Sequence, residues 1–212
     1  MAFPPVTVVS GRAIPLLADN IDTDVIIRIE RLTDVPRADL GRHVFEALRY
    51  DGNGKAVDDH VLNDPHLANA PILLAGRNFG CGSSREGAVW ALQARGIRAV
   101  IAESFGSIFV ANCFQNGLLP IALERAEIAS LSDVAQRGPE ASLEIELAAQ
   151  RINGPDGLDI AFDINPLRRQ CLLDGITDVE LTARFSDQIA SVKAQDRSAR
   201  PWLYRATAAP DG

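Results

Sequence analysis

Three short apolar segments in the middle of the chain are separated by two stretches with helical periodicity. The strands are expected at residues 71–75, 98–102 and 118–123, and the helices at residues 84–95 and 107–116. Gly96 and Gly117 follow the two helical stretches directly, as glycines often do at helix ends. A strand–helix–strand–helix–strand order implies parallel strands joined by crossover helices. The chain is therefore predicted to have an α/β fold.

A different pattern follows this central region. Residues 142–151 and 158–164 alternate between apolar and polar side chains, which indicates half-buried strands. Between them lies Asn153-Gly154-Pro155-Asp156-Gly157, a turn-forming sequence. We expect a mixed sheet, with parallel strand–helix–strand units and an added antiparallel hairpin.

The two ends of the chain are less regular. Residues 31–70 are rich in Asp, Gly, Asn and Pro, which predicts a long functional loop with short helices, one of them near residues 40–48. From Ser186 onwards we expect one amphipathic helix and then a frayed end. The predicted organisation is an α/β domain over residues 1–185, followed by a C-terminal helix and flexible tail over residues 186–212.

Composition excludes several classes of function. The 212 residues are 47% hydrophobic, enough for a large core, and carry a net charge of −7, which argues against nucleic-acid binding. No apolar run approaches the roughly 18–20 residues that cross a bilayer, and no signal peptide is evident. Three widely spaced cysteines form neither a disulfide framework nor a metal-finger pattern. A cytoplasmic protein is expected.

The stretch from Asn78 to Glu86 is the strongest candidate site, because it joins the first central strand to the first helix, where α/β proteins bind ligands. Gly80 and Gly82 would let a ligand approach the backbone closely. The start of the helix offers unpaired N–H groups, and Arg85 can grip a carboxylate with two hydrogen bonds. This combination predicts a site for a carboxylate or another oxyanion.

Other interpretations of the same stretch remain open. Ser83 and Glu86 form S-x-x-E, and a capping box that merely starts the helix is equally compatible with the pattern. A dinucleotide fingerprint is disfavoured because Arg85 stands where the third glycine should be. A nucleophile elbow is disfavoured because Glu86 replaces its last glycine. The histidines all fall in the predicted loop, so no Ser–His pair is apparent; they are His43, His60 and His66.

Five motifs, in order along nearly the whole chain, resemble those of the small subunits of 3-isopropylmalate dehydratase and of the swivelling domain of aconitase. They comprise Asn20–Ile27; Asn78–Glu86 with Ala88 and Trp90–Leu92; Ser104-Phe105 with Ile108-Phe109 and Asn112–Pro120; Arg168–Ile176; and Arg200–Leu203. The resemblance implies an aconitase-type swivelling domain. It also implies a subunit of a hydro-lyase that isomerises 2-isopropylmalate and 3-isopropylmalate by dehydration and rehydration in leucine biosynthesis.

The resemblance assigns roles to particular residues. Ser83, as an alkoxide, would be the base that removes a proton from the carbon next to the leaving hydroxyl, and Arg85 would bind a substrate carboxylate. A free serine hydroxyl is a very poor base, so N–H donors and a cation must stabilise its alkoxide. The other expected substrate-binding residues are Gly82, Ser84, Asp22, Thr23 and Asp24, of which Asp22, Thr23 and Asp24 could equally be turn formers.

The resemblance also implies a partner. The leaving hydroxyl needs a Lewis acid, which in this family is a 4Fe-4S cluster held by the large subunit. Cys81, Cys113 and Cys171 lack the C-x-x-C spacing typical of cluster ligands, so we expect no cofactor on this chain. We expect Cys81 to be a small buried hydrophobe rather than a reactive thiol. The expected partners are the large subunit, in a heterodimer or heterotetramer, and a small 2-hydroxy dicarboxylate.

Three positions depart from the family pattern. Gly87 and Val89 stand where histidine and proline are usual, and Gln170 stands where histidine is common. These departures leave open a related substrate of the citramalate, dimethylmalate or homoaconitate type, or a non-catalytic ligand-binding paralogue. The segment Arg28–Tyr50, where the family recognises the distal group of the substrate, resembles the bacterial isopropylmalate type.

Overall fold

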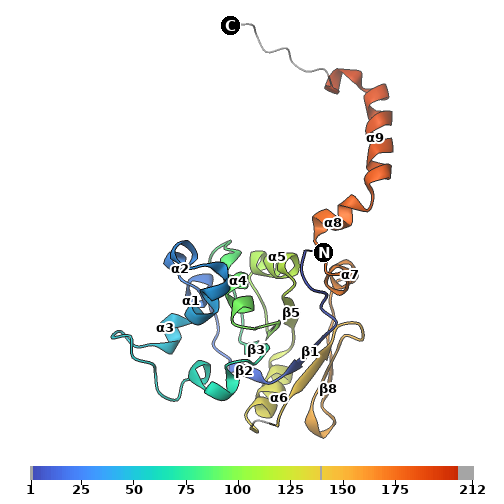
Figure 1. The fold of residues 1–212 in the computed structure, drawn as a ribbon. Helices are drawn as coiled ribbons and strands as arrows, with labels where there is room; N and C mark the ends of the chain where they lie inside the picture. Colours follow the sequence, from blue (N-terminus) through green and yellow to red (C-terminus); the bar gives the residue numbers. More distant parts are fainter. Residues whose placement is uncertain (1, 139, 205–212) are drawn as a thin grey trace. The chain divides into compact units, whose positions relative to one another are not determined.

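The computed structural model describes residues 2–138 and 140–204, so the end of the expected C-terminal tail lies outside the described residues. The chain divides into two compact units, one ending at Thr177 and the other beginning at Asp178. The α/β domain expected from the sequence extends to residue 185, eight residues further. The elements of each unit can be followed in Figure 1.

A parallel sheet forms the centre of the first unit. Its strands, in spatial order, are β2 (Ala13–Leu16), β3 (Ile72–Ala75), β4 (Ala99–Ala102) and β5 (Leu119–Ala122). All three strand pairs are parallel. Every residue of β3 and β4 is buried, as expected for strands that are covered on both faces. The three central strands and the α/β class predicted from the sequence are confirmed.

Alternate residues of these strands belong to two hydrophobic cores. Leu73 and Val100 face one core, which includes Leu92 and Phe109 from the helices α4 (Gly87–Ala94) and α5 (Ser107–Asn116). Their neighbours in the strands face a second core, to which α6 (Arg125–Ala135) contributes Leu131. Figure 1 shows α6 on the opposite side of the strands from α4 and α5.

The two crossover helices differ in how well the sequence predicted them. Helix α5 has the predicted limits and ends at Gly117, whose φ of 74° lies in the left-handed region that glycine favours. Helix α4 begins at Gly87, three residues later than the predicted start at residue 84. The residues before Gly87 are instead part of the loop that carries the candidate site.

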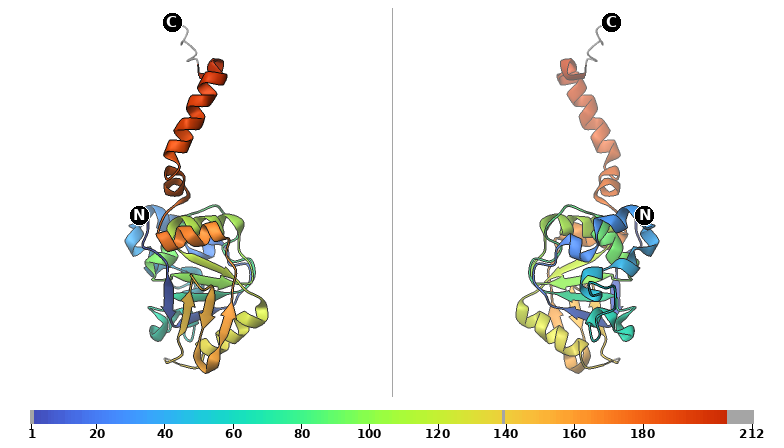
Figure 2. Two further views of the ribbon diagram at one scale, coloured as in Figure 1. Left: turned by 90° about the vertical axis from the view of Figure 1, so that its right-hand side faces the viewer. Right: turned by 90° about the vertical axis from the view of Figure 1, so that its left-hand side faces the viewer.

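A second, antiparallel sheet contains β1 (Val8–Gly11), β6 (Leu143–Glu146), β7 (Arg151–Asn153) and β8 (Asp159–Ala161), in that spatial order. The predicted turn at residues 153–157 does connect two antiparallel strands, β7 and β8. The predicted strand over residues 142–151 is wrong, because a turn that includes Gln150, with φ of 55°, divides it into β6 and β7. The parallel and antiparallel parts therefore form two sheets. Figure 2 shows the antiparallel strands and α6 from two sides.

The predicted functional loop is a layer of short helices. They are η1 (Arg37–His43), α3 (Glu46–Arg49), η2 (Val61–Asn63), η3 (Pro65–Leu67) and the end of α2 (Ile29–Asp34), while α1 (Thr23–Ile26) precedes the predicted loop. Leu40 and Phe45 are fully buried in the first core. A Cβ on Gly41 would lie 2.4 Å from the carbonyl oxygen of Ala94, so η1 packs directly on the end of α4. Part of this segment is therefore fixed against the helix that follows the candidate site.

Helix α7 (Pro166–Asp174) ends the first unit, capped at its start by the side chain of Asn165. The second unit contains α8 (Asp178–Ala183), α9 (Ser186–Ala199) and η5 (Pro201–Tyr204). The helix expected from Ser186 is thus present. None of the residues described in this unit is buried.

Candidate active site

The chain remains paired beyond the ends of β2 and β3. Within the sheet Leu16 pairs with Ala75, a separation of 75 − 16 = 59 positions, and further on Asp22 pairs with Cys81, which is again 81 − 22 = 59. Between these points the amide of Gly80 donates to the carbonyl of Ile21 at 2.7 Å. We call residues 17–22 and 76–81 the two strand extensions. They connect the sheet to the candidate site and end on a pair with the same offset as the last pair of the sheet.

Each extension contains one asparagine in the left-handed region. The φ angle is 58° at Asn20 and 60° at Asn78, a conformation that most side chains disfavour and asparagine tolerates. The side-chain amide of Asn78 donates to the side-chain oxygen of Asn20 at 2.9 Å, and the backbone amide of Asn20 donates to Arg77 O at 2.8 Å. The two extensions are thus joined to each other where each has this unusual backbone.

The residues after β4 support the second extension from its other side. Ser104 accepts two hydrogen bonds at 2.9 Å, from the amide of Asn78 to its hydroxyl and from the amide of Phe79 to its carbonyl. Gly80 has φ of 71°, and a Cβ there would lie 2.3 Å from the ring of Phe109. Only glycine fits this position, because both the backbone angle and the packed ring exclude a side chain.

Thr23 and Ser83 face each other at the ends of the extensions. The Oγ1 of Thr23 and the Oγ of Ser83 are 2.6 Å apart, and the amide of Thr23 donates to Cys81 O at 3.0 Å. Thr23 is only 1% exposed, and Ser83 is half-buried. Asp22 holds the start of α1 in place, because its carboxylate accepts from the amide of Val25 at 2.8 Å. Asp22 is thus the N-cap of α1.

The capping-box interpretation of Ser83 and Glu86 is wrong. Helix α4 begins after Glu86, which occupies the N-cap position without a side-chain capping bond. The hydroxyl of Ser83 is paired with Thr23 instead. The carboxylate of Glu86 accepts from the side-chain amide of Asn116 at 2.7 Å, which ties the start of α4 to the end of α5.

Arg85 forms an ion pair with Asp24. The Arg85 side chain is 28% exposed and that of Asp24 is 54% exposed, so the pair lies at the surface of the site. Gly82, with φ of 93°, lies against Asp22, since its Cβ position is 3.2 Å from the Cβ of the aspartate. Ser84 is exposed in the same loop. The structure therefore brings residues 22–24 and 82–85 into one place.

Asn116 is a structural residue that the sequence analysis missed. Its side-chain oxygen accepts from the indole of Trp90 at 3.0 Å, and its backbone oxygen accepts from Gln93 at 2.6 Å. The guanidinium of Arg37 lies over the Trp90 ring, 4.5 Å from its centroid. An asparagine directly before the helix-ending Gly117 is the signal in the sequence that could have indicated such a role.

The three cysteines differ in burial. Cys113 and Cys171 are buried in α5 and α7, and burial raises the pKa of the Cys113 thiol. Cys81 is partly exposed, so the expectation that it is buried is wrong. Across residues 2–138 and 140–204, no group of three or more His, Cys, Asp or Glu side chains could hold a metal ion. These residues do not fit an iron–sulfur cluster.

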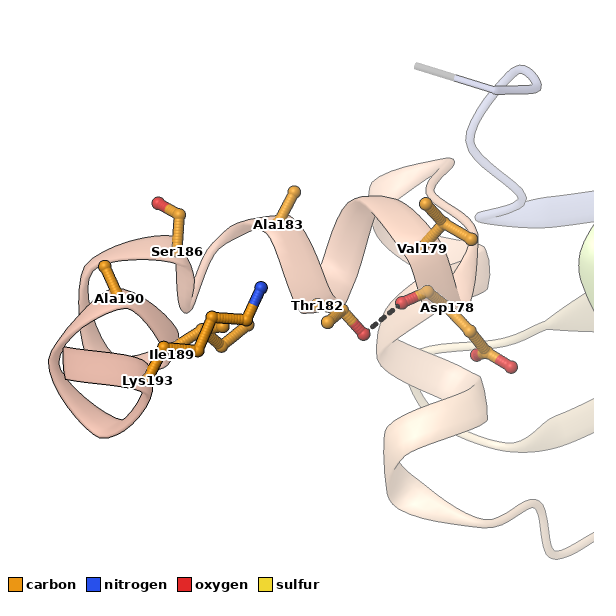
Figure 3. Close-up of a pocket in the computed structure, with 8 residues that line it drawn as sticks. All are labelled: Asp178, Val179, Thr182, Ala183, Ser186, Ile189, Ala190 and Lys193. Carbon is orange, nitrogen blue, oxygen red and sulfur yellow. Dashed lines mark hydrogen bonds between the residues drawn. The ribbon is translucent and has the colours of Figure 1, made fainter. Parts of the chain in front are cut away.

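Two further observations concern regions outside this site. Among the described helices, none is long and apolar enough to cross a membrane. In the second unit, Val179, Ala183, Ile189 and Ala190 line an open hollow between α8 and α9, and Thr182 is bonded there to the carbonyl of Asp178 (Figure 3). None of the candidate site residues contributes to this hollow.

Family models and a solved structure show similarity to known proteins over most of this chain. Residues 3–126 match the model of the aconitase C-terminal domain, and residues 129–166 match that of LeuD_N. A solved structure of 3-isopropylmalate dehydratase (LeuD) from Methanocaldococcus jannaschii superposes with a TM-score of 0.63 at 28% identity. This superposition covers 87% of the present chain and 99% of the archaeal one.

Curated relatives are more similar in sequence. The 3-isopropylmalate dehydratase small subunit of Parvibaculum lavamentivorans is 48% identical, over 92% of this chain and 96% of the relative. That of Paramagnetospirillum magneticum is 47% identical, over 93% of this chain and 98% of the relative. With this similarity over nearly its whole length and an aconitase-type fold, the chain belongs to the family of 3-isopropylmalate dehydratase small subunits.

Proposed function

We propose that this chain completes the active site of a 3-isopropylmalate dehydratase, which interconverts 2-isopropylmalate and 3-isopropylmalate by dehydration and rehydration in leucine biosynthesis. The observation that carries the proposal is the contact between the hydroxyls of Thr23 and Ser83, 2.6 Å apart, in the loop that also carries Arg85, which is paired with Asp24. The names of the curated relatives support this substrate, and the segment Arg28–Tyr50 resembles the bacterial isopropylmalate type.

Ser83 is the proposed base. During dehydration its oxygen takes the proton from the substrate carbon adjacent to the carbon that loses its hydroxyl, and on rehydration it returns a proton. A serine oxygen can do this only if its anionic form is stabilised. The hydroxyl of Thr23 is close enough to donate to that anion. Thr23 is buried, so water competes little for this hydrogen bond.

Arg85 is the proposed carboxylate clamp. Its present partner, Asp24, is more than half exposed and can turn into solvent when a substrate carboxylate arrives. Such an exchange replaces one carboxylate with another, so the arginine keeps a negative partner throughout. A planar guanidinium can hold the substrate carboxylate with two parallel hydrogen bonds, which fixes its orientation. Gly82, Ser84 and Asp22 complete the proposed substrate-binding surface.

A separate large subunit is the proposed partner, in a heterodimer or heterotetramer. The described residues of this chain do not fit a 4Fe-4S cluster, so we place the cluster on the large subunit, where it would supply Lewis-acid chemistry for the leaving hydroxyl. The proposed location is the cytoplasm. A net charge of −7 supports a partner that is not a nucleic acid.

An assay of the assembled enzyme tests this proposal. The chain is mixed with a reconstituted large subunit, and the dehydration of isopropylmalate is followed. We expect turnover with the parent chain and a loss of nearly all turnover with Ser83→Ala. The matched control is Ser130→Ala, which removes an exposed hydroxyl from α6 and should leave turnover unchanged.

Two outcomes would contradict the proposal. Turnover by Ser83→Ala within a few-fold of the parent would show that Ser83 is not the base. A parent complex that dehydrates citramalate or dimethylmalate but not isopropylmalate would show that the substrate is wrong while the reaction class is right. Circular dichroism of both variants checks that the fold is intact.

A further inference from the structure

The contact between Thr23 and Ser83 joins two residues that are 60 positions apart in the chain. Neither residue belongs to a strand of the central sheet. The strand before Thr23, β2, ends at Leu16, and the strand before Ser83, β3, ends at Ala75. The two strand extensions, residues 17–22 and 76–81, must therefore bring the hydroxyls together. How they do so determines where the proposed base lies.

The two extensions end on a pair with the same offset as the sheet, although each contains an asparagine in the left-handed region. The pairing of Asp22 with Cys81 has the same offset of 59 as the pairing of Leu16 with Ala75. If one extension bent without the other, this pairing would be lost. Asn20 and Asn78 are the non-glycine residues of the extensions in this region, and Gly80, with φ of 71°, is a further left-handed position in the second extension.

The side chains of these asparagines connect the two bends. The amide of Asn78 donates to the side-chain oxygen of Asn20 at 2.9 Å, and neither side chain contacts Thr23 or Ser83 through a hydrogen bond found among the described residues. After Asn20 and Asn78, the amide of Thr23 donates to Cys81 O at 3.0 Å. This hydrogen bond joins the ends of the two extensions next to the contact between the two hydroxyls.

We propose that Asn20 and Asn78 are a pair of positioning residues for the reaction, whose left-handed backbone sets the separation between the hydroxyls of Thr23 and Ser83. The proposal rests on the proposed function of Ser83 as the base. Asparagine suits both positions because it tolerates the left-handed region and its short amide can bridge to the other strand. Alanine would oppose the same backbone, whereas glycine would permit it without the bridge.

This difference between alanine and glycine is the basis of the test. In the assembled enzyme, we expect Asn20→Ala and Asn78→Ala to lower kcat by about tenfold to a hundredfold, because small misplacements of reacting groups are costly. KM should stay within about threefold, since Arg85 continues to hold the substrate. We expect Asn20→Gly and Asn78→Gly to restore kcat to within about threefold of the parent.

Asp156→Ala is the matched control. Asp156 also has a left-handed backbone, with φ of 58°, but it lies in the turn between β7 and β8 of the antiparallel sheet. The control should lower the melting temperature while leaving kcat unchanged. A general effect of left-handed alanine on the fold is thereby separated from an effect on the reaction.

The possible outcomes are distinct. Alanine variants that keep the parent kcat would overturn the proposal, as would glycine variants that are as slow as the alanine variants. If the alanine variants fail to fold, the double variant Asn20→Gly/Asn78→Gly decides: we expect a folded enzyme with kcat within about tenfold of the parent, and a greater loss overturns the role of the backbone.

Ser83→Ala, measured alongside, separates this inference from the proposed function. If Ser83→Ala is inactive but Asn78→Ala is as fast as the parent, only the positioning role fails. If Ser83→Ala remains active, the proposed function fails, whatever the asparagine variants do.

Discussion

The side-chain oxygens of Thr23 and Ser83 lie 2.6 Å apart, and the threonine is almost completely buried while the serine is half-buried. The threonine hydroxyl therefore has little access to water, and Ser83 is its partner. A hydroxyl held in this way can favour the anionic form of its neighbour by donating to it. A single substitution at Thr23 can measure how strongly its hydroxyl stabilises the anionic form of Ser83.

Thr23→Val replaces the hydroxyl with a methyl group of similar size. We expect kcat to fall by about tenfold to a hundredfold, because one donor to a developing oxyanion is lost. The pKa that governs the basic form of Ser83 should rise, so the pH–rate profile should move to higher pH. Thr182→Val, in the second unit, is the control. An unchanged profile and kcat would mean that Thr23 has only a packing role.

Arg85→Lys tests the carboxylate clamp. Lysine keeps the charge but cannot form two parallel hydrogen bonds, so substrate binding should weaken by about 1.5–3 kcal/mol. The melting temperature should hardly change, because the present partner of Arg85 is an exposed carboxylate. Arg151→Lys, which alters a surface pair with Asp159, is the control. A large loss of stability with unchanged substrate affinity would contradict the clamp.

Much of the central sheet could be predicted because its strands are continuous apolar runs and its helices end at glycines. The site was harder to predict for a physical reason. Ser83 and Glu86 satisfy the local pattern of a capping box. In the structure, however, the Ser83 hydroxyl is hydrogen-bonded to Thr23, 60 positions away, and the Glu86 carboxylate accepts from Asn116. The break between β6 and β7 was missed because Gln150, which adopts the left-handed backbone there, is not a typical turn residue.

Glu46 makes stability depend on pH. Burial tends to raise the pKa of Glu46, but hydrogen bonds from His43, at 2.5 Å, and from Arg31, at 2.9 Å, outweigh it and hold the pKa below its usual value. A lowered pKa contributes stability above the unfolded value that is lost as the pH falls through the folded value. Glu46→Gln should cost about 1.5–3 kcal/mol at pH 7 and little at pH 3.

Urea unfolding at both pH values measures this effect. Glu30→Gln, an exposed position on α2, is the control and should change stability little at either pH. An equal loss for Glu46→Gln at pH 7 and pH 3 would show that the ionic partners of Glu46 do not contribute.

Gly87 is the family departure with the clearest structural counterpart. A Cβ there would lie 2.5 Å from both terminal methyl groups of Leu32, so the leucine fills the space that a side chain would need. Gly87→Ala should therefore destabilise the fold by about 1–3 kcal/mol despite the better helix propensity of alanine. In the background of Leu32→Ala the same change should be neutral or stabilising. A thermodynamic cycle of the four proteins measures the coupling, and additive effects would contradict the contact.

The shared register of the two strand extensions restricts how this family of sequences can change. Five residues separate the paired points on each side, 17–21 in one extension and 76–80 in the other. Losing or gaining one residue on a single side would shift the pairing by one step and turn Thr23 or Ser83 to the opposite face. We therefore expect insertions and deletions in the two strand extensions to be tolerated only when both change together, which would give two stretches far apart in the gene a common length.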